Sequence, residues 1–313
     1  MLYIGAVGRS GSTLINRLLG ELPGVCSIGE LVYTWERGIV EGNRCGCGET
    51  FYRCTFWRDV LGAAFGGSEK AYAARISELR AGVDRTRYIP WLLAPSPPGR
   101  IRRRRDEYVS YCVQIYQAVQ SVTGCSVIAD ASKNASYAFC LRSSNELDLR
   151  VLHIVRDSRA VAHSWTRKVR RAEPTGPEYM PVVPPAKTAW WWDYQNGALQ
   201  MLAATGTPTL RVRYEDFVAA PEATLAEIAR FTGLGLRTGH LGFIGADEKG
   251  RWADLAAGHL ASGNPNRFQS GRIRLTLDDE WRTAMSGPGR RTVTALTFPL
   301  LSHYGYLSRR PSA

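Results

Sequence analysis

The sequence lacks the long apolar segments expected of a membrane or exported protein. No run of about 18 apolar residues occurs among its 313 residues, so we expect no membrane-spanning helix. Neither a basic segment nor a long apolar segment precedes the short apolar run that starts at Leu2, so we expect no signal peptide. The seven cysteines are odd in number, which argues against a disulfide framework. These absences together predict a cytoplasmic protein.

Acidic residues are scarce relative to basic ones. The chain carries 28 Asp and Glu against 40 Lys and Arg, a net charge of +12. This excess suits an anionic ligand or acceptor, and it would also suit nucleic acid or a membrane surface. Much of it lies between Arg100 and Arg105, where a solvated basic face is the commoner explanation. The length and the 44% hydrophobic content allow one large α/β domain with a substantial core.

The first chemical signature lies near the N-terminus. Residues 2–7 form a short apolar run that predicts a buried strand, and apolar residues from 14 to 22 recur at helical spacing. Between them stand two glycines, a cation and three hydroxyls: Gly8, Arg9, Ser10, Gly11, Ser12 and Thr13. A glycine-containing turn before a helix N-terminus presents unpaired N–H groups to an anion. We therefore expect a phosphate to bind here.

The same turn departs from the loop of nucleoside triphosphatases. That loop has the pattern G-x-x-x-x-G-K-[ST], in which Lys contacts the outer phosphates and Ser or Thr contacts Mg²⁺. Here Ser12 follows Gly11 directly, and the cation, Arg9, comes before it. A nucleoside triphosphatase is therefore disfavoured.

Further strands alternate with helices along the chain. Apolar runs at 126–130, 149–155 and 209–214 are each followed by a segment with helical spacing, and no internal repeat is visible. This order predicts a parallel sheet wrapped by helices. Ligands of such sheets bind at the carboxyl ends of the strands. Arg9, Lys133 and Arg156 should then line one rim and converge on an anionic ligand.

Three cysteines lie close together in sequence. Cys45 and Cys47 are separated by one glycine, and Cys54 follows. A zinc site is conceivable, but the C-x-C spacing and the absence of a nearby histidine depart from the usual four-ligand patterns. We therefore favour a loop of packed or oxidised thiols.

These pieces together resemble the PAPS-dependent sulfotransferase family, in particular its bacterial members. Residues 8–13 look like the family's 5′-phosphosulfate loop. Arg156 and Ser164 match its 3′-phosphate motif, an Arg at a strand end with a Ser eight residues later. Residues 129–133 are similar to the segment that brings a Lys near the sulfuryl group. The segment 263–271 resembles the loop that closes over the nucleotide, and the likeness spans roughly residues 1 to 306.

The resemblance implies an α/β fold of the P-loop-like type, with a central parallel sheet flanked by helices in a single domain over residues 1–313. It implies transfer of a sulfuryl group from PAPS to a hydroxyl of a small-molecule, glycan or lipid acceptor, with release of adenosine 3′,5′-bisphosphate. No metal and no nucleic-acid partner are expected. Insertions around 36–105 and 171–190 would shape the acceptor pocket. The residues implied to bind the cofactor are Arg9, Ser10, Gly11, Ser12, Thr13, Arg156, Ser164, Asn264 and Arg267.

Arg9, Lys133 and Glu30 are the implied catalytic residues. Cytosolic members of the family use a His just after the strand that here ends in Asp130, and this sequence has none there. Glu30, at a position where other members place a carboxylate, is the favoured base, with Asp130 as the alternative. Two rival functions remain: a small-molecule kinase, which would need Mg²⁺ and the absent Lys, and a nucleic-acid-binding module at residues 100–105. The acceptor and the oligomeric state stay open.

Overall fold

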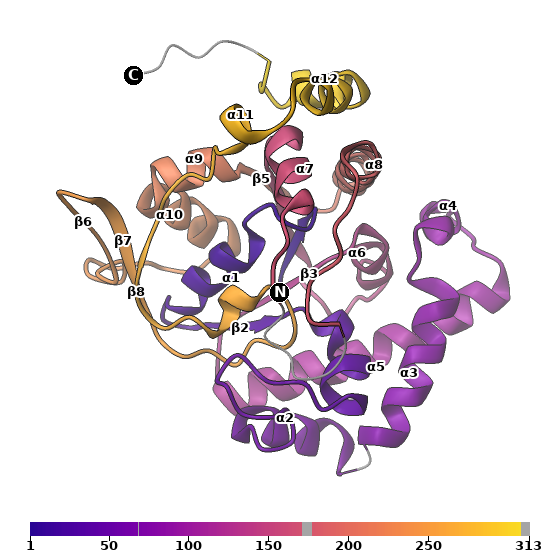
Figure 1. Ribbon diagram of the computed structural model, residues 1–313. Helices are drawn as coiled ribbons and strands as arrows, with labels where there is room; N and C mark the ends of the chain where they lie inside the picture. Colours follow the sequence, from indigo (N-terminus) through magenta and orange to yellow (C-terminus); the bar gives the residue numbers. More distant parts are fainter. Residues whose placement is uncertain (68, 171–176, 308–313) are drawn as a thin grey trace.

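The computed structural model describes residues 1–67, 69–170 and 177–307. Its centre is a five-stranded parallel sheet with the strand order β2-β3-β1-β4-β5 (Figure 1). The strands are β1 (Leu2–Ala6), β2 (Val25–Gly29), β3 (Val127–Lys133), β4 (Arg150–Val155) and β5 (Thr209–Arg213). Helices cover both faces of this sheet. The predicted α/β fold with a central parallel sheet is confirmed.

α-Helices connect the strands and make up much of the rest of the described chain. They are α1 (Ser12–Gly20), α2 (Thr55–Phe65), α3 (Glu69–Val83), α4 (Ile89–Leu93), α5 (Gly99–Thr123), α6 (Ala135–Leu141), α7 (Ser158–Thr166), α8 (Pro185–Ala204), α9 (Tyr214–Ala219), α10 (Pro221–Thr232), α11 (Trp281–Ala284), α12 (Gly287–Leu296) and α13 (Phe298–His303). Short 3₁₀ helices span Leu31–Tyr33, Thr86–Tyr88 and Pro265–Phe268, and a π-helix spans Thr34–Val40.

The central strand β1 shows why the sheet needs both layers. Leu2 and Ile4 point to one face and pack in a cluster with α1 and α10, whereas Tyr3 points to the other and contacts Tyr137 of α6 edge to face. A Cβ on Gly5 would lie 2.5 Å from the Leu199 side chain of α8. Glycine at this position therefore lets α8 approach the strand closely.

Several element boundaries differ from those that local sequence patterns predict. The Ala-rich and charged composition of residues 59–82 predicts one helix, but the segment forms two, α2 and α3, because α2 ends at Gly66 in the left-handed conformation. The prolines of residues 90–98 predict a linker, but this segment begins inside α4, whose first turn accommodates Pro90. Ser158 is a plausible N-cap from the sequence, but the N-cap of α7 is Asp157, whose carboxylate accepts a bond from the Arg159 backbone N–H at 2.9 Å.

The five prolines of residues 171–186 predict a loop. Part of this segment lies outside the described residues, and α8 already begins at Pro185.

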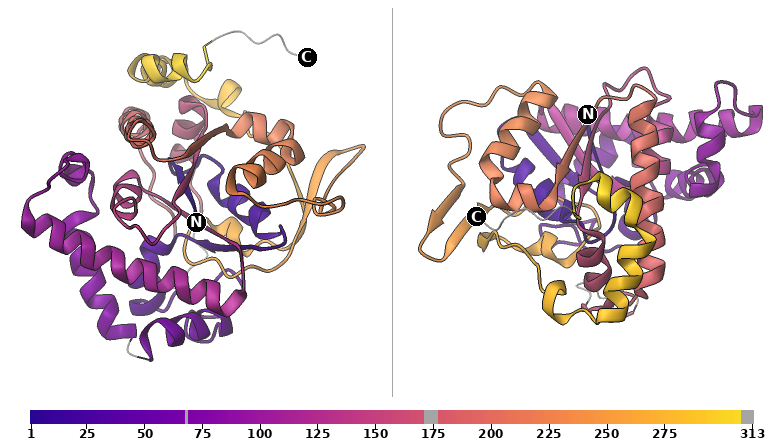
Figure 2. Two further views of the ribbon diagram at one scale, coloured as in Figure 1. Left: turned by 180° about the vertical axis from the view of Figure 1, so that it is seen from behind. Right: turned by 90° about the horizontal axis from the view of Figure 1, so that it is seen from above.

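Sequence patterns did not reveal the second sheet. Strands β6 (Ile244–Asp247), β7 (Gly250–Leu255) and β8 (Gly271–Arg274) form an antiparallel sheet that projects from the main body (Figure 2). Helices α2, α3 and α5 pack together on the opposite side of the molecule (Figure 1). Within the described ranges no helix is both long and apolar enough to cross a bilayer.

Candidate active site

The turn between β1 and α1 has the geometry of an anion site. Gly11 has φ of 82°, and a Cβ there would lie 2.2 Å from the Tyr214 ring, so only glycine fits. Gly11 caps α1 without any side-chain hydrogen bond to the first N–H groups. The positive end of the α1 dipole is therefore open toward the space beyond β1.

A cavity of about 1070 Å³ opens at the carboxyl ends of β1, β3 and β4. This is the edge at which open α/β sheets bind their ligands. The predicted site residues that line it are Arg9, Gly11, Ser12, Thr13, Glu30, Lys133, Arg156, Ser164 and Asn264. The fold thus brings together side chains separated by more than two hundred positions in the sequence.

Two predicted cofactor residues do not line the cavity. Ser10 is buried under the turn. Arg267 is 2% exposed, and its guanidinium donates to the carbonyls of Gly263 at 2.9 Å and Arg44 at 3.4 Å. The position of Arg267 is that of a residue that shapes the 263–268 loop. The residues of this loop that line the cavity are Gly263, Asn264 and Asn266.

Arg9 is held as a largely buried cation beside aromatic and thioether groups. Its guanidinium lies 5.2 Å from the centre of the Trp165 ring and donates to Met180 Sδ at 3.1 Å. Burial, together with nearby Arg167, lowers the pKa of Arg9. It forms no ion pair with a described carboxylate, and its Nε has no hydrogen-bond partner there. A buried cation of this kind is stabilised by an anionic ligand.

Arg156 extends from the end of β4 into the same cavity. It donates to the Arg9 carbonyl at 3.0 Å and to the Asp278 carbonyl at 2.7 Å, and it lies over the Tyr214 ring. Its Nε is buried without a partner among the described residues. These contacts fix the guanidinium directly beside the turn at residues 8–13.

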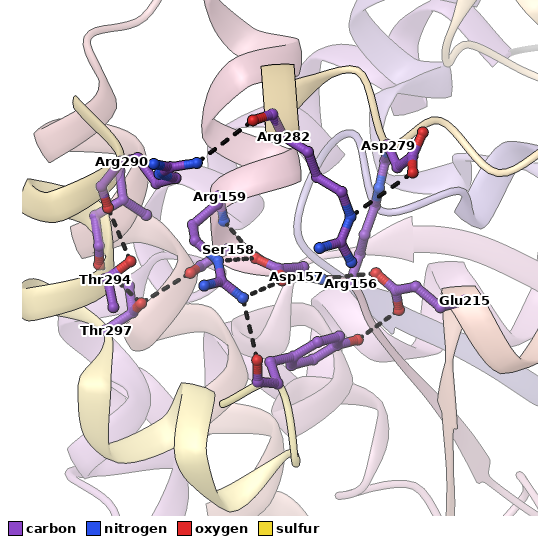
Figure 3. Close-up of polar contacts among 12 residues, drawn as sticks. Arg156, Asp157, Ser158, Arg159, Glu215, Asp279, Arg282, Arg290, Thr294 and Thr297 are labelled. Atoms are coloured by element: carbon purple, nitrogen blue, oxygen red, sulfur yellow. Dashed lines mark hydrogen bonds and ion pairs between the residues drawn. The ribbon is translucent and has the colours of Figure 1, made fainter. Parts of the chain in front are cut away.

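The chain just after Arg156 is anchored by a polar network (Figure 3). The Asp157 backbone N–H donates to Glu215 Oε1 at 3.1 Å, and Tyr306 donates its hydroxyl to Glu215 Oε2 at 2.6 Å. Burial raises the pKa of Glu215. In the same view, Ser158 and Thr297 share a 2.8 Å hydrogen bond that attaches α7 to the C-terminal helices. The end of β4 is thereby fixed from two sides.

Glu30 and Lys133 both line the cavity and form an ion pair. They follow β2 and end β3, which are neighbours in the sheet, so the parallel register brings their side chains to one edge. The Glu30 backbone N–H donates to the Ala261 carbonyl at 2.7 Å, and a Cβ on Gly263 would lie 3.0 Å from Glu30 Oε1. The 261–263 segment therefore covers the carboxylate closely.

Asp130, the alternative base, has a different position. It is fully buried, does not line the cavity, and accepts bonds from the Tyr116 hydroxyl at 2.7 Å and the Ser132 N–H at 2.8 Å. Burial raises the pKa of Asp130 to about 6. Its oxygens are occupied by the protein, so of the two candidate bases only Glu30 lines the cavity.

The three consecutive tryptophans divide between core and cavity. Trp192 is buried and donates its indole N–H to the Arg156 carbonyl at 2.8 Å, whereas Trp190 and Trp191 line the cavity. Sequence reasoning missed Trp165 and Tyr33, which also line it. Neither lies in a motif, although Trp165 follows Ser164 directly.

The basic run at 100–105 lies in the first turns of α5 and contributes nothing to the cavity lining. Arg102 and Arg103 are exposed, and Arg105 pairs with Asp106 at 2.7 Å. This arrangement is that of a solvated basic face.

No family model and no curated protein sequence matches this chain. Solved structures do match it. The sulfotransferase domain of the Synechococcus PCC 7002 olefin synthase has 21% identity and a TM-score of 0.52, over 96% of this chain and 94% of that one. The sulfotransferase domain from the curacin biosynthetic pathway has 17% identity and a TM-score of 0.52, over 96% of each chain. The chain therefore has the fold of these sulfotransferase domains.

Proposed function

We propose that this protein transfers a sulfuryl group from PAPS to a hydroxyl group of an acceptor and releases adenosine 3′,5′-bisphosphate. The observation that carries the proposal is one cavity whose lining includes the α1 N-terminus, Arg9, Lys133 and Arg156. Such a lining suits a ligand with two separated anionic groups. The fold shared with sulfotransferase domains supports the same function.

The residues present fit this cofactor. The open N–H groups of α1, with Ser12, Thr13 and Arg9, would hold the 5′-phosphosulfate. Arg156 and Ser164 would hold the 3′-phosphate, and Asn264 would contact the nucleotide from the covering loop. The buried, unpartnered Nε atoms of Arg9 and Arg156 are donors that an anion would satisfy.

PAPS supplies a sulfuryl group attached to a phosphate leaving group. As in phosphoryl transfer, the protein's task is then alignment and stabilisation of charge. Arg9 and the N–H groups of the turn stabilise the negative charge on the leaving oxygen. Lys133 stabilises the sulfuryl oxygens, and Glu30 accepts the proton of the acceptor hydroxyl. No step in this scheme assigns a role to a metal ion.

The cavity also has aromatic lining residues, which suit an acceptor with an apolar or ring-shaped surface. Trp190, Trp191 and Tyr33 line it, and Tyr194 stacks on Trp190 with 5.6 Å between ring centres. Aromatic faces of this kind pack on sugars, phenols and lipid chains. Trp190 belongs to the segment 171–190, and Arg37 and Thr86 line the cavity from the segment 36–105, the two segments that we propose shape the acceptor site; Tyr33, Trp191 and Tyr194 lie just outside them. The acceptor is a small molecule, glycan or lipid, and the enzyme works in the cytoplasm.

Thermal unfolding with adenosine 3′,5′-bisphosphate, against ATP with Mg²⁺, tests the proposal. A ligand at about a hundred times its dissociation constant stabilises by roughly 2.7 kcal/mol, which is a shift of a few degrees. We expect this shift with the bisphosphate. Ser164→Ala should reduce it, whereas Ser110→Ala, an exposed serine on α5, should leave it unchanged. A shift with ATP and Mg²⁺ alone would favour the kinase, and no shift with either would overturn the cofactor assignment.

A further inference from the structure

A cluster of cysteines and a histidine lies outside the proposed catalytic machinery. Cys45, Cys47 and Cys54 come from the segment before α2, and His259 comes from the loop after β7. Their four potential ligand atoms all lie within 4.8 Å of one another. The sequence argued against a metal here because no histidine was near. The fold brings one in from more than two hundred residues away.

Three distances, among Cys45, Cys54 and His259, are close to those between ligands of one tetrahedral ion. Cys54 Sγ lies 3.5 Å from Cys45 Sγ and 3.3 Å from His259 Nδ1, and Cys45 Sγ lies 3.8 Å from that nitrogen. Zinc–sulfur bonds of about 2.3 Å and zinc–nitrogen bonds of about 2.0 Å in tetrahedral geometry place neighbouring ligands roughly 3.5–3.8 Å apart. The seven cysteines are all free thiols in the structure, so no disulfide accounts for this proximity.

The surroundings hold these groups in place. The Trp57 indole N–H donates to the His259 carbonyl at 2.9 Å, and Phe56 stacks on the His259 ring with 5.0 Å between centres. Gly46, between the first two cysteines, donates its N–H to the Leu260 carbonyl at 3.0 Å. A Cβ on Gly46 would lie 2.7 Å from the Gly258 carbonyl oxygen. Glycine in the C-x-C segment thus permits contact with the histidine loop.

We propose that Cys45, Cys47, Cys54 and His259 bind one structural Zn²⁺ ion. Three thiolates and one imidazole form a complete tetrahedral set of the kind that structural zinc sites use, with no position left for substrate. On binding, the three thiols release their protons to solvent, and the imidazole coordinates through neutral Nδ1. Cys45 and Cys54 are almost fully buried, at 0% and 1% exposure, which suits a structural site.

The position of the proposed zinc site indicates its structural role. His259 and Ala261 lie in one short segment, and Ala261 pairs with β2 next to Glu30. That segment continues into Gly263 and Asn264, which line the cavity. A zinc ion would therefore attach the covering loop to the segment before α2 and hold the loop against Glu30. This role is independent of the identity of the cofactor or acceptor.

Metal analysis of the untagged protein, purified under reducing conditions, tests the proposal. We expect about one zinc per chain. Cys54→Ala and His259→Ala should reduce the zinc content to background. Cys140→Ala, which removes an equally buried cysteine on α6, should leave it at one per chain. None of these readouts needs catalytic activity, so the zinc site and the proposed function can fail separately.

Cobalt reconstitution covers the case in which the variants fail to fold. Wild-type protein stripped of metal and loaded with Co²⁺ should show the intense visible absorption of a tetrahedral thiolate site, and Cys47→Ser should weaken it. A folded wild type that holds no zinc and gives no such absorption with Co²⁺ would overturn the proposal. A Cys45–Cys54 disulfide in the freshly purified protein would overturn it as well.

Discussion

Two arginine-bearing regions of this molecule have the same charge and opposite surroundings. Arg102 and Arg103 on α5 extend into solvent. Arg9 lies over the Trp165 ring and Arg156 over the Tyr214 ring, and the Nε of each has no hydrogen-bond partner among the described residues. A solvated arginine is already satisfied by water, whereas a buried one with an unpaired donor gains much from an anion. The net charge of +12 therefore does not indicate where the ligand binds, whereas the burial of individual arginine side chains does.

The largest expected effect concerns Glu30, whose carboxylate lines the same cavity as Arg9 and Arg156. Glu30→Gln keeps the size of the side chain but removes the proposed proton acceptor, so we expect kcat for sulfuryl transfer to fall roughly 10²–10⁴-fold. The affinity for adenosine 3′,5′-bisphosphate, measured by calorimetry, should stay about the same, since Glu30 is not proposed to hold the nucleotide. An active Glu30→Gln enzyme would remove Glu30 from the mechanism.

The second expected effect compares the two arginine regions directly. Arg9→Ala should lower kcat by roughly 10²–10³-fold, the usual cost of losing one preorganised donor at a developing charge. Arg102→Ala removes the same charge from α5 and should leave steady-state rates unchanged within about twofold. Equal losses in the two variants would mean that the overall charge, rather than the buried site, drives binding.

Much of the architecture could be predicted from local patterns. Short apolar runs and glycine-containing turns identified β1, β3 and β4, because buried parallel strands have a strong local signature. The run at 209–214 also identified β5, although this edge strand is only partly buried. The antiparallel sheet β6-β7-β8 was missed, since its short strands are largely exposed and lack an apolar run. The break between α2 and α3 contains two glycines with positive φ, Gly66 and Gly67, which periodicity does not reveal.

The candidate site divides in the same way. Lys133 and Arg156 could be placed at one rim because parallel strands end at one edge of a sheet. Arg267 was placed in the cofactor site by likeness of motif, yet its side chain is directed to backbone carbonyls. His259 could not be assigned to the cysteines at all, because its proximity arises only from the pairing of residues 258–261 with β2 and the C-x-C segment. Contacts across distant segments leave no local pattern.

We propose that two separate anion sites of this protein bind one nucleotide. Titration calorimetry of adenosine 3′,5′-bisphosphate and of adenosine 5′-phosphate, which lacks only the 3′-phosphate, tests it most directly. A charge-assisted contact from Arg156 should make the bisphosphate bind at least about tenfold more tightly. Equal affinities for the two nucleotides would contradict a 3′-phosphate site at Arg156 and Ser164, and with it the account of this protein as a PAPS-dependent sulfotransferase.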